Sequence, residues 1–183
     1  MGKRFEAAER ELAKQIGVRY CVALPADKGA LLAARVLASG ELGERSLGRG
    51  EEVIVVGTSC ERELAALRSL GVVGACVSAD ADAAALEQAL SPATKAVWVC
   101  ADAASGSVCV ARNFCNAFDL WMLATVKPRE ERSCLFEGKA YHVGAVADVA
   151  TGSFEDVAFA CTKDTLPYEL MCVLRGELLS SEK

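Results

Sequence analysis

A lysine that follows an apolar run is the residue best placed to do chemistry. Val157–Cys161 is apolar and ends at Thr162-Lys163, and a turn with Pro167 leads to a second apolar run, Met171–Leu174. Two strands of this kind would present the amine of Lys163 at the tip of a sheet. Such an amine attacks carbonyl groups when burial or a neighbouring cation lowers its pKa. The alternative is an ordinary solvated lysine at a strand end.

Thiols and imidazoles, the other groups that carry chemistry, do not form a metal pattern. The chain has nine cysteines and one histidine, His142. Most of the cysteines lie inside apolar runs, and no two have CxxC spacing. Zinc sites need clustered Cys and His ligands, so no metal site is predicted. We interpret the cysteines as small buried hydrophobes in a reducing compartment.

Composition excludes several classes of protein. The 183 residues are 52% apolar and 25% charged, with a formal net charge of -5. This is typical of a globular domain and not of a disordered chain. Lys and Arg are scattered, so no nucleic-acid-binding face is expected. No apolar run reaches the roughly 18 residues of a membrane span, and the N-terminal segment is a charged amphipathic helix. We expect a cytoplasmic protein without a membrane partner.

Strands and helices alternate along the chain. Apolar runs predict strands over 20–24, 52–56, 72–77, 96–100 and 120–124, followed by the two closing runs. Helical periodicity predicts helices over 5–16, 29–37, 61–70, 82–90 and 107–118. Asp27 is the expected N-cap of the second helix, and Asp80 or Asp82 that of the fourth. The stretch 135–151 is predicted to be irregular, with glycines as breakers.

This order predicts an α/β fold, a three-layer α/β/α domain around a mostly parallel, mixed sheet of about seven strands. The last two strands are joined too closely for a helical crossover, so one of them should run antiparallel. The whole chain, 1–183, is read as a single domain.

Ligands of such sheets bind beyond the carboxyl ends of the strands. Asp102 and Ser105-Gly106 fall at this edge, where they either bind a polar ligand or form a turn with a helix cap. The segments expected there are Pro25–Lys28, Gly57–Cys60, Ala101–Gly106, Thr125–Lys127 and Thr162-Lys163.

Several stretches, in colinear order, resemble a known family. They are FEAAERELAKQIGVRYCVALP, GALLAARVL, GEEVIVV, LRSLGVVGACV and LEQALSPATKAVWV. They are similar to the DegT/DnrJ/EryC1/StrS family of sugar aminotransferases, which are fold type I enzymes that depend on pyridoxal phosphate (PLP). The similarity runs from Phe5 to about Val99 and more loosely to Arg175. It covers the large cofactor domain of the family, and we expect the small C-terminal domain to be absent.

The resemblance implies a set of site positions. Family members hold the cofactor phosphate with a Ser-Gly-Thr turn, where this chain has Ala26, Asp27 and Lys28; Lys28 would neutralise the phosphate. An aromatic ring that covers the cofactor corresponds to Cys60. The aspartate that pairs with the pyridine nitrogen corresponds to Thr125. The lysine that forms the Schiff base corresponds to Lys163.

These substitutions lead to two hypotheses. In the first, the chain is a truncated relative that is not a competent aminotransferase by itself and serves as a binding or assembly module. In the second, it binds PLP and transfers an amino group to a nucleotide-linked keto sugar through a Schiff base at Lys163. The family site lies at a homodimer interface. We therefore expect a dimer or larger oligomer, with a separately encoded protein partner as a further option.

Overall fold

The computed structural model describes residues 6–7, 9–11, 13–14, 19–24, 28–126, 141–146, 156–160 and 166–181. Seven strands form one sheet in the order β1-β7-β6-β5-β4-β2-β3. The five strands from β6 to β3 run parallel, and β7 is antiparallel to both β6 and β1. The strands are β1 (Tyr20–Leu24), β2 (Glu52–Val56), β3 (Val73–Val77), β4 (Thr94–Val99), β5 (Trp121–Val126), β6 (Tyr141–Val146) and β7 (Asp156–Ala160).

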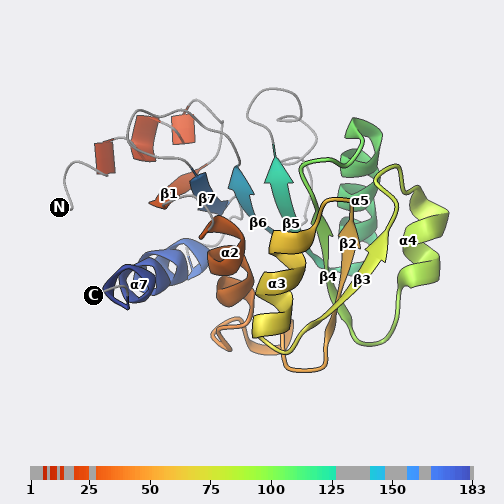
Figure 1. Cartoon of the computed structure of the whole chain (residues 1–183), viewed down its shortest axis with the longest axis horizontal. Coiled ribbons are helices and arrows are strands. Elements are labelled where there is room, and N and C mark those ends of the chain that lie inside the picture. The colour runs from red at the N-terminus through yellow and green to blue at the C-terminus, as the bar shows by residue number, and fades with distance from the viewer. Residues whose placement is uncertain are drawn as a thin grey trace.

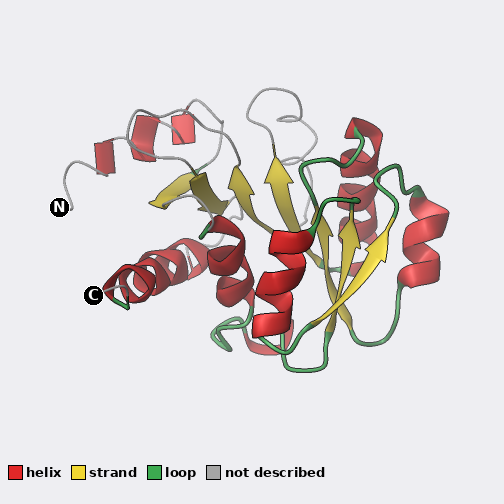
Figure 2. Ribbon diagram, viewed as in Figure 1, coloured by secondary structure: helices red, strands yellow, loops and turns green. Residues whose placement is uncertain are grey.

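Helices cover both faces of the sheet, which confirms the α/β fold class (Figure 1). Side chains of α2, α3 and α7 pack on one face, and side chains of α4 and α5 pack on the other. Figure 2 shows the strands between these two layers of helices. The helices are α2 (Gly29–Leu37), the 3-10 helix η1 (Gly43–Arg45), α3 (Glu61–Ser69), α4 (Ala83–Ala89), α5 (Ser105–Phe118) and α7 (Leu166–Ser180).

Strand β2, which lies between β4 and the edge strand β3, shows why nearly continuous apolar runs predict this architecture. Val53 and Val55 belong to the core under α2 and α3, whereas Ile54 and Val56 belong to the core under α4 and α5. All four side chains are buried. Successive residues of a strand point to opposite faces, so a strand covered on both sides must be apolar throughout.

Two parts of the predicted element order are wrong. Met171–Leu174 lies inside α7 and is not a strand. The stretch predicted to be irregular contains β6, and Gly144 pairs in register with Ala124 within it. The apolar run of α7 is a helix because it continues the fifteen-residue segment Leu166–Ser180, which packs on α2 and β1. The antiparallel strand is β7, the first of the two closing runs.

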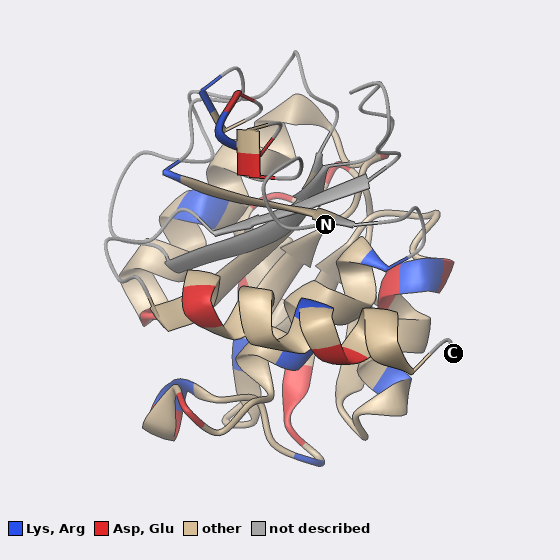
Figure 3. Cartoon of the chain, turned by 90° about the vertical axis from the view of Figure 1, so that its left-hand side faces the viewer, with Lys and Arg blue, Asp and Glu red and all other residues tan. Residues whose placement is uncertain are grey.

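A polar contact joins the N-terminal helical residues to the last helix. Glu9 is buried, accepts a hydrogen bond from the Ala23 amide at 2.9 Å and forms an ion pair with Arg175 of α7. Nearby, the rings of Tyr20 and Tyr168 stack with centroids 4.6 Å apart. On this side of the molecule, basic and acidic residues are intermixed (Figure 3). None of the helices in the described part of the chain combines the length and apolar character of a membrane span.

Candidate functional site

The carboxyl ends of β2, β4 and β5 carry the polar groups of the candidate site. Thr58 and Ser59 follow β2, Asp102 follows β4, and Thr125 is the next-to-last residue of β5. These strands are neighbours in the order β5-β4-β2, so their ends meet at one edge of the sheet. Helix α3 begins at the same edge and adds Glu63 in its first turn.

Asp102 closes the turn after β2. Its Oδ2 accepts hydrogen bonds from the Thr58 amide at 2.8 Å, the Thr58 hydroxyl at 2.5 Å and the Ser59 amide at 2.9 Å. Hydrogen bonds to a carboxylate stabilise its charged form. The Thr58 hydroxyl and the two amides therefore lower the pKa of Asp102. Two roles were expected for Asp102, and the structure shows the one in a turn. Its hydrogen bonds join the segment after β4 to the segment after β2.

Ser105 and Gly106 are the first residues of α5, whose N-cap is Ala104. The cap makes no side-chain hydrogen bond, so the predicted helix cap at this position is wrong. By contrast, Asp82 is the N-cap of α4, as predicted, and accepts a hydrogen bond from the Ala85 amide at 2.9 Å.

Two buried thiols lie beneath this turn. Cys60 and Cys100 are hydrogen-bonded to each other, and a Cβ added at Gly57 would lie 2.9 Å from Cys60 Sγ and 2.8 Å from Cys100 Cβ. Burial raises the pKa of each thiol, and the carboxylates of Asp102 and Glu63 add to the rise. A thiol is a nucleophile only as the thiolate, so both cysteines are held in their unreactive form. This agrees with their interpretation as buried hydrophobes.

Thr125 and Glu63 form the buried polar centre of the edge. The Thr125 hydroxyl donates to Glu63 Oε1 at 2.8 Å, and Trp98 Nε1 donates to Thr125 Oγ1 at 3.3 Å. All three residues are buried. Sequence reasoning did not identify Glu63. The sequence pattern that could have identified it is its spacing. Glu63 lies three residues after Cys60 and four before Leu67, so it shares their core-facing side of the helix.

The remaining predicted positions are only partly described. Lys28 is the N-cap of α2, one residue later than predicted, and its side chain does not cap the helix. The predicted N-cap Asp27 and the Schiff-base candidate Lys163 lie outside the described residues, as does Ala26. The structure thus brings Cys60 and Thr125 together around Glu63, which was not among the predicted site positions.

The Asp102 turn makes stability depend on pH. The folded-state pKa of Asp102 is below its ordinary value of 3.8, so its stabilising effect is complete above that value. The effect is lost as the pH falls through the lower folded-state pKa. We expect Asp102→Asn to lower the urea midpoint at pH 7, and the difference from wild type to shrink below about pH 4. Glu87→Gln, on the exposed side of α4, is the control. A difference that stays constant from pH 7 to pH 3 would contradict the prediction.

Comparison with known proteins supports the fold. No model of a known protein family matches the sequence. Lipopolysaccharide biosynthesis protein RfbH of Salmonella typhimurium is 28% identical over 163 residues, which are 84% of this chain and 36% of RfbH. DesV of S. venezuelae superposes with a TM-score of 0.70 at 23% identity, covering 96% of this chain and 48% of DesV. NtdA of Bacillus subtilis was solved with bound cofactor PMP. It superposes with a TM-score of 0.67 at 15% identity, covering 93% of this chain and 39% of NtdA.

The chain spans about half the length of DesV and about a third of the length of RfbH. Over that span the similarity to the solved structures includes nearly every element of this chain. The chain therefore has the fold of DegT/DnrJ/EryC1/StrS-type sugar aminotransferases, as the resemblance in its sequence implied.

Proposed function

We propose that this chain is a binding module that holds a ligand of the pyridoxal phosphate class at the carboxyl edge of its sheet, and that it does not transfer amino groups by itself. The observation that carries the proposal is the buried pair Thr125–Glu63 at the end of β5. Buried carboxylates are rare unless they are paired or functional. The fold is shared with NtdA, which was solved with PMP bound.

The residues at this edge fit the two polar ends of such a ligand. Helix α2 begins here with a lysine at its N-cap and no acidic residue in its first turn. A helix N-terminus attracts anions through its free amides and its dipole, and Lys28 adds a positive charge for a phosphate. Thr125 and Glu63 lie at the ends of other elements of the same edge and offer oxygen acceptors to a nitrogen.

The same residues argue against catalysis by this chain alone. When bound, pyridoxal phosphate acts as an electron sink. Cys60 occupies the position that corresponds to a stacking ring, and a small buried thiol cannot hold the ring plane as an aromatic side chain does. Because burial also raises the pKa of the Cys60 thiol, it remains neutral and contributes no charge. The residues at this edge are therefore suited to bind the cofactor but not to fix the orientation of its ring.

A second candidate is aminotransfer to a keto sugar through Lys163. The observation in its favour is Glu63, which supplies a negative charge next to Thr125. In this candidate Glu63 of α3 supplies the carboxylate that family members place at the position of Thr125 in β5.

Equilibrium dialysis against micromolar PLP, followed by visible absorption spectroscopy, tests the proposal. We expect the wild-type protein to retain the cofactor and to release no product from glutamate and a nucleotide-linked keto sugar. Lys163→Ala tests for a covalent link to the cofactor, and Lys28→Ala tests for binding of its phosphate. Arg68→Ala, on the exposed side of α3, is the control.

Failure of the wild-type protein to retain PLP would overturn the proposed function. Turnover that disappears in Lys163→Ala would replace the binding module with the second candidate.

A further inference from the structure

The two edge strands of the sheet, β1 and β3, are protected differently (Figure 1). An edge strand presents unpaired N–H and C=O groups that pair readily with another strand, unless charged side chains or a covering segment block them. The outer side of β1 has such a cover. The Glu9 carboxylate accepts a hydrogen bond from the Ala23 amide of β1 and pairs with Arg175 of α7.

The outer side of β3 carries free backbone groups at Gly74 and Cys76. The Val73 amide donates to the Glu51 carbonyl at 2.8 Å, and the Val77 carbonyl accepts from an amide that follows β2, at 3.2 Å. These two residues therefore face β2. The hydrogen-bonding groups of successive residues alternate between the two sides of a strand, so Gly74 and Cys76 direct theirs outward. Among the described residues, none donates to these groups or accepts from them.

Strand β3 lacks the usual defences of an edge. Its sequence, VGACV, has neither a charged residue nor a proline, and it pairs with β2 over all five residues without a bulge. Val73 is 51% exposed, and Cys76 is exposed as well. Charges, prolines and bulges are the features that keep edge strands from pairing with other chains. The outer side of β3 is therefore open to a further strand.

A second copy of β3 is complementary to this edge when the two strands run antiparallel. With Ala75 opposite Ala75 of the partner subunit, the outward groups of Gly74 face those of Cys76 of the partner subunit. Each such pair exchanges both of its N–H···O bonds. Val73 then lies opposite Val77 of the partner subunit, so its exposed side chain gains an apolar neighbour and no like charges meet.

The charges near the two ends of β3 favour the same orientation. At the amino end, a Cβ added at Gly71 would lie 2.9 Å from Arg49 Cγ, so the exposed Arg49 side chain runs along the start of the strand. The acidic neighbour Glu51 is paired with Lys95 at 3.7 Å. Asp80 is exposed three residues beyond the carboxyl end. Antiparallel pairing brings the arginine end of one copy to the aspartate end of the other.

We propose that β3 is an interface strand, through which two copies of this chain pair antiparallel about Ala75 and join their sheets into one continuous sheet. The contact is isologous, so it closes as a dimer and does not propagate. The outermost strands of the joined sheet are then the two β1 strands, which carry the Glu9 cover. The interface leaves Thr125 and Glu63 untouched and does not depend on the proposed function.

Analytical ultracentrifugation over a range of concentrations tests the interface. We expect a wild-type dimer whose dissociation constant rises roughly tenfold or more in Val73→Lys, because the variant removes two cross-strand apolar pairs and adds charge to the edge. Val173→Lys in α7 is the matched control. It makes the same change at an exposed valine, 60% accessible against 51% for Val73, and should leave the dimer unchanged.

Cross-linking tests the register. In a Cys76→Ser background, Ala75→Cys should form an interchain disulfide on mild oxidation, because Cα atoms of a non-hydrogen-bonded antiparallel pair lie about 4.5 Å apart. The background without Ala75→Cys is the control and should give no such dimer in non-reducing electrophoresis. The native Cys76 thiols should not cross-link to each other, since diagonal residues lie about 7–8 Å apart, too far for a disulfide.

A charge exchange tests the orientation. Arg49→Glu and Asp80→Lys should each weaken the dimer, because each places like charges at both ends of the interface. A mixture of the two variants should restore it, since every contact then joins opposite charges. A wild-type protein that stays monomeric at high concentration would overturn the inference. A dimer that resists Val73→Lys and forms no disulfide in Ala75→Cys would overturn it too, because its interface would lie elsewhere. Retention of PLP tests the proposed function separately.

Discussion

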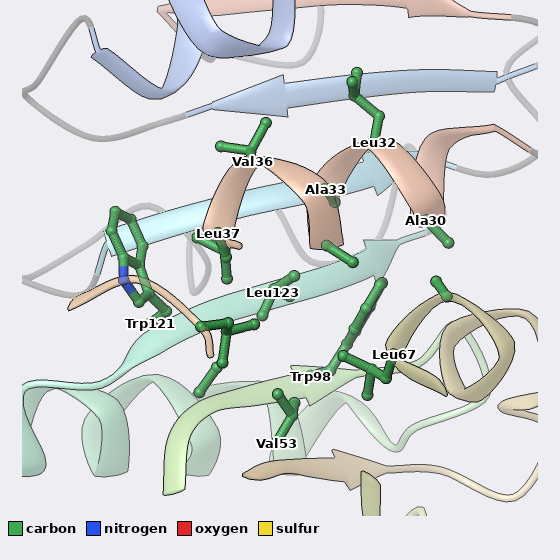
Figure 4. Close-up of a cluster of buried hydrophobic side chains, with 14 of the residues drawn as sticks. Ala30, Leu32, Ala33, Val36, Leu37, Val53, Leu67, Trp98, Trp121 and Leu123 are labelled. Atoms are coloured by element: carbon green, nitrogen blue, oxygen red, sulfur yellow. The ribbon is translucent and has the colours of Figure 1, made fainter. Parts of the chain in front are cut away.

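Replacing Trp98 with alanine should destabilise the protein by about 3–5 kcal/mol, the usual effect of removing a large aromatic side chain from a core. Trp98 is fully buried and belongs to the core between the sheet and helices α2 and α3. Figure 4 shows it beside Leu67 of α3. The substitution leaves a cavity there and removes the indole N–H that donates a hydrogen bond to the Thr125 hydroxyl.

Urea denaturation followed by circular dichroism measures this effect, with Trp98→Phe as the comparison. Phenylalanine retains most of the ring volume but not the N–H, so we expect a loss of about 1–2 kcal/mol from the hydrogen bond and the smaller ring. The difference between the two variants separates packing from hydrogen bonding. If Trp98→Ala were as stable as Trp98→Phe, the ring would not be an essential part of this core.

Local residue patterns were sufficient to predict several elements. Helix α2 has the predicted bounds, Gly29–Leu37, because its apolar face and the break at Ser39-Gly40 both appear within a short stretch. Asp82 could be identified as a cap because Asp, Ser, Thr and Asn satisfy the free amides of a first helical turn. In such cases the residues that determine the element lie next to one another in sequence.

The incorrect predictions share a different cause. Met171–Leu174 is apolar enough for a strand, and only its packing on α2 and β1 makes it part of a helix. Gly144 is a helix and strand breaker by propensity, yet β6 forms between β5 and β7. Short apolar runs do not distinguish a strand from a buried helix, and glycine propensity is overridden when neighbours on both sides complete the hydrogen bonds.

The candidate site was predictable in position but not in composition. The rule that ligands bind beyond the carboxyl ends of parallel strands brought Cys60, Asp102 and Thr125 to one edge. The partner of Thr125 was missed, because Glu63 lies 62 residues earlier in the chain and within a segment rich in charged residues. A pairing between a helix and a strand over that separation is a property of the tertiary structure alone.

The thiols, the turn and the Thr125–Glu63 pair are linked through the segment between β2 and α3. Asp102 holds Thr58 and Ser59, and Cys60 follows directly as the N-cap of α3. Glu63 lies three residues further, in the first turn of this helix. The position of the Glu63 carboxylate therefore depends on the path of the turn, and the turn depends on a single glycine.

Gly57→Ala should accordingly destabilise the fold by about 2–4 kcal/mol, from backbone strain and overpacking together. Gly57 has φ +148°, a conformation that favours glycine. An added Cβ would lie 2.6 Å from Asp102 Oδ1, 2.8 Å from Cys100 Cβ and 2.9 Å from Cys60 Sγ. Because Cys60 and Cys100 are buried, the turn must shift to relieve these contacts, and Glu63 must shift with the start of α3.

Gly176→Ala in α7 is the control, since nothing lies within 4 Å of its added Cβ and alanine favours the helix. We expect the control to raise the urea midpoint slightly and Gly57→Ala to lower it. At a temperature where Gly57→Ala is still folded, its affinity for pyridoxal phosphate should also fall, although neither Thr125 nor Glu63 has changed. Unaltered stability in Gly57→Ala would mean that the turn adapts freely. The geometry of the Thr125–Glu63 pair would then have to be maintained by the core around Trp98 instead.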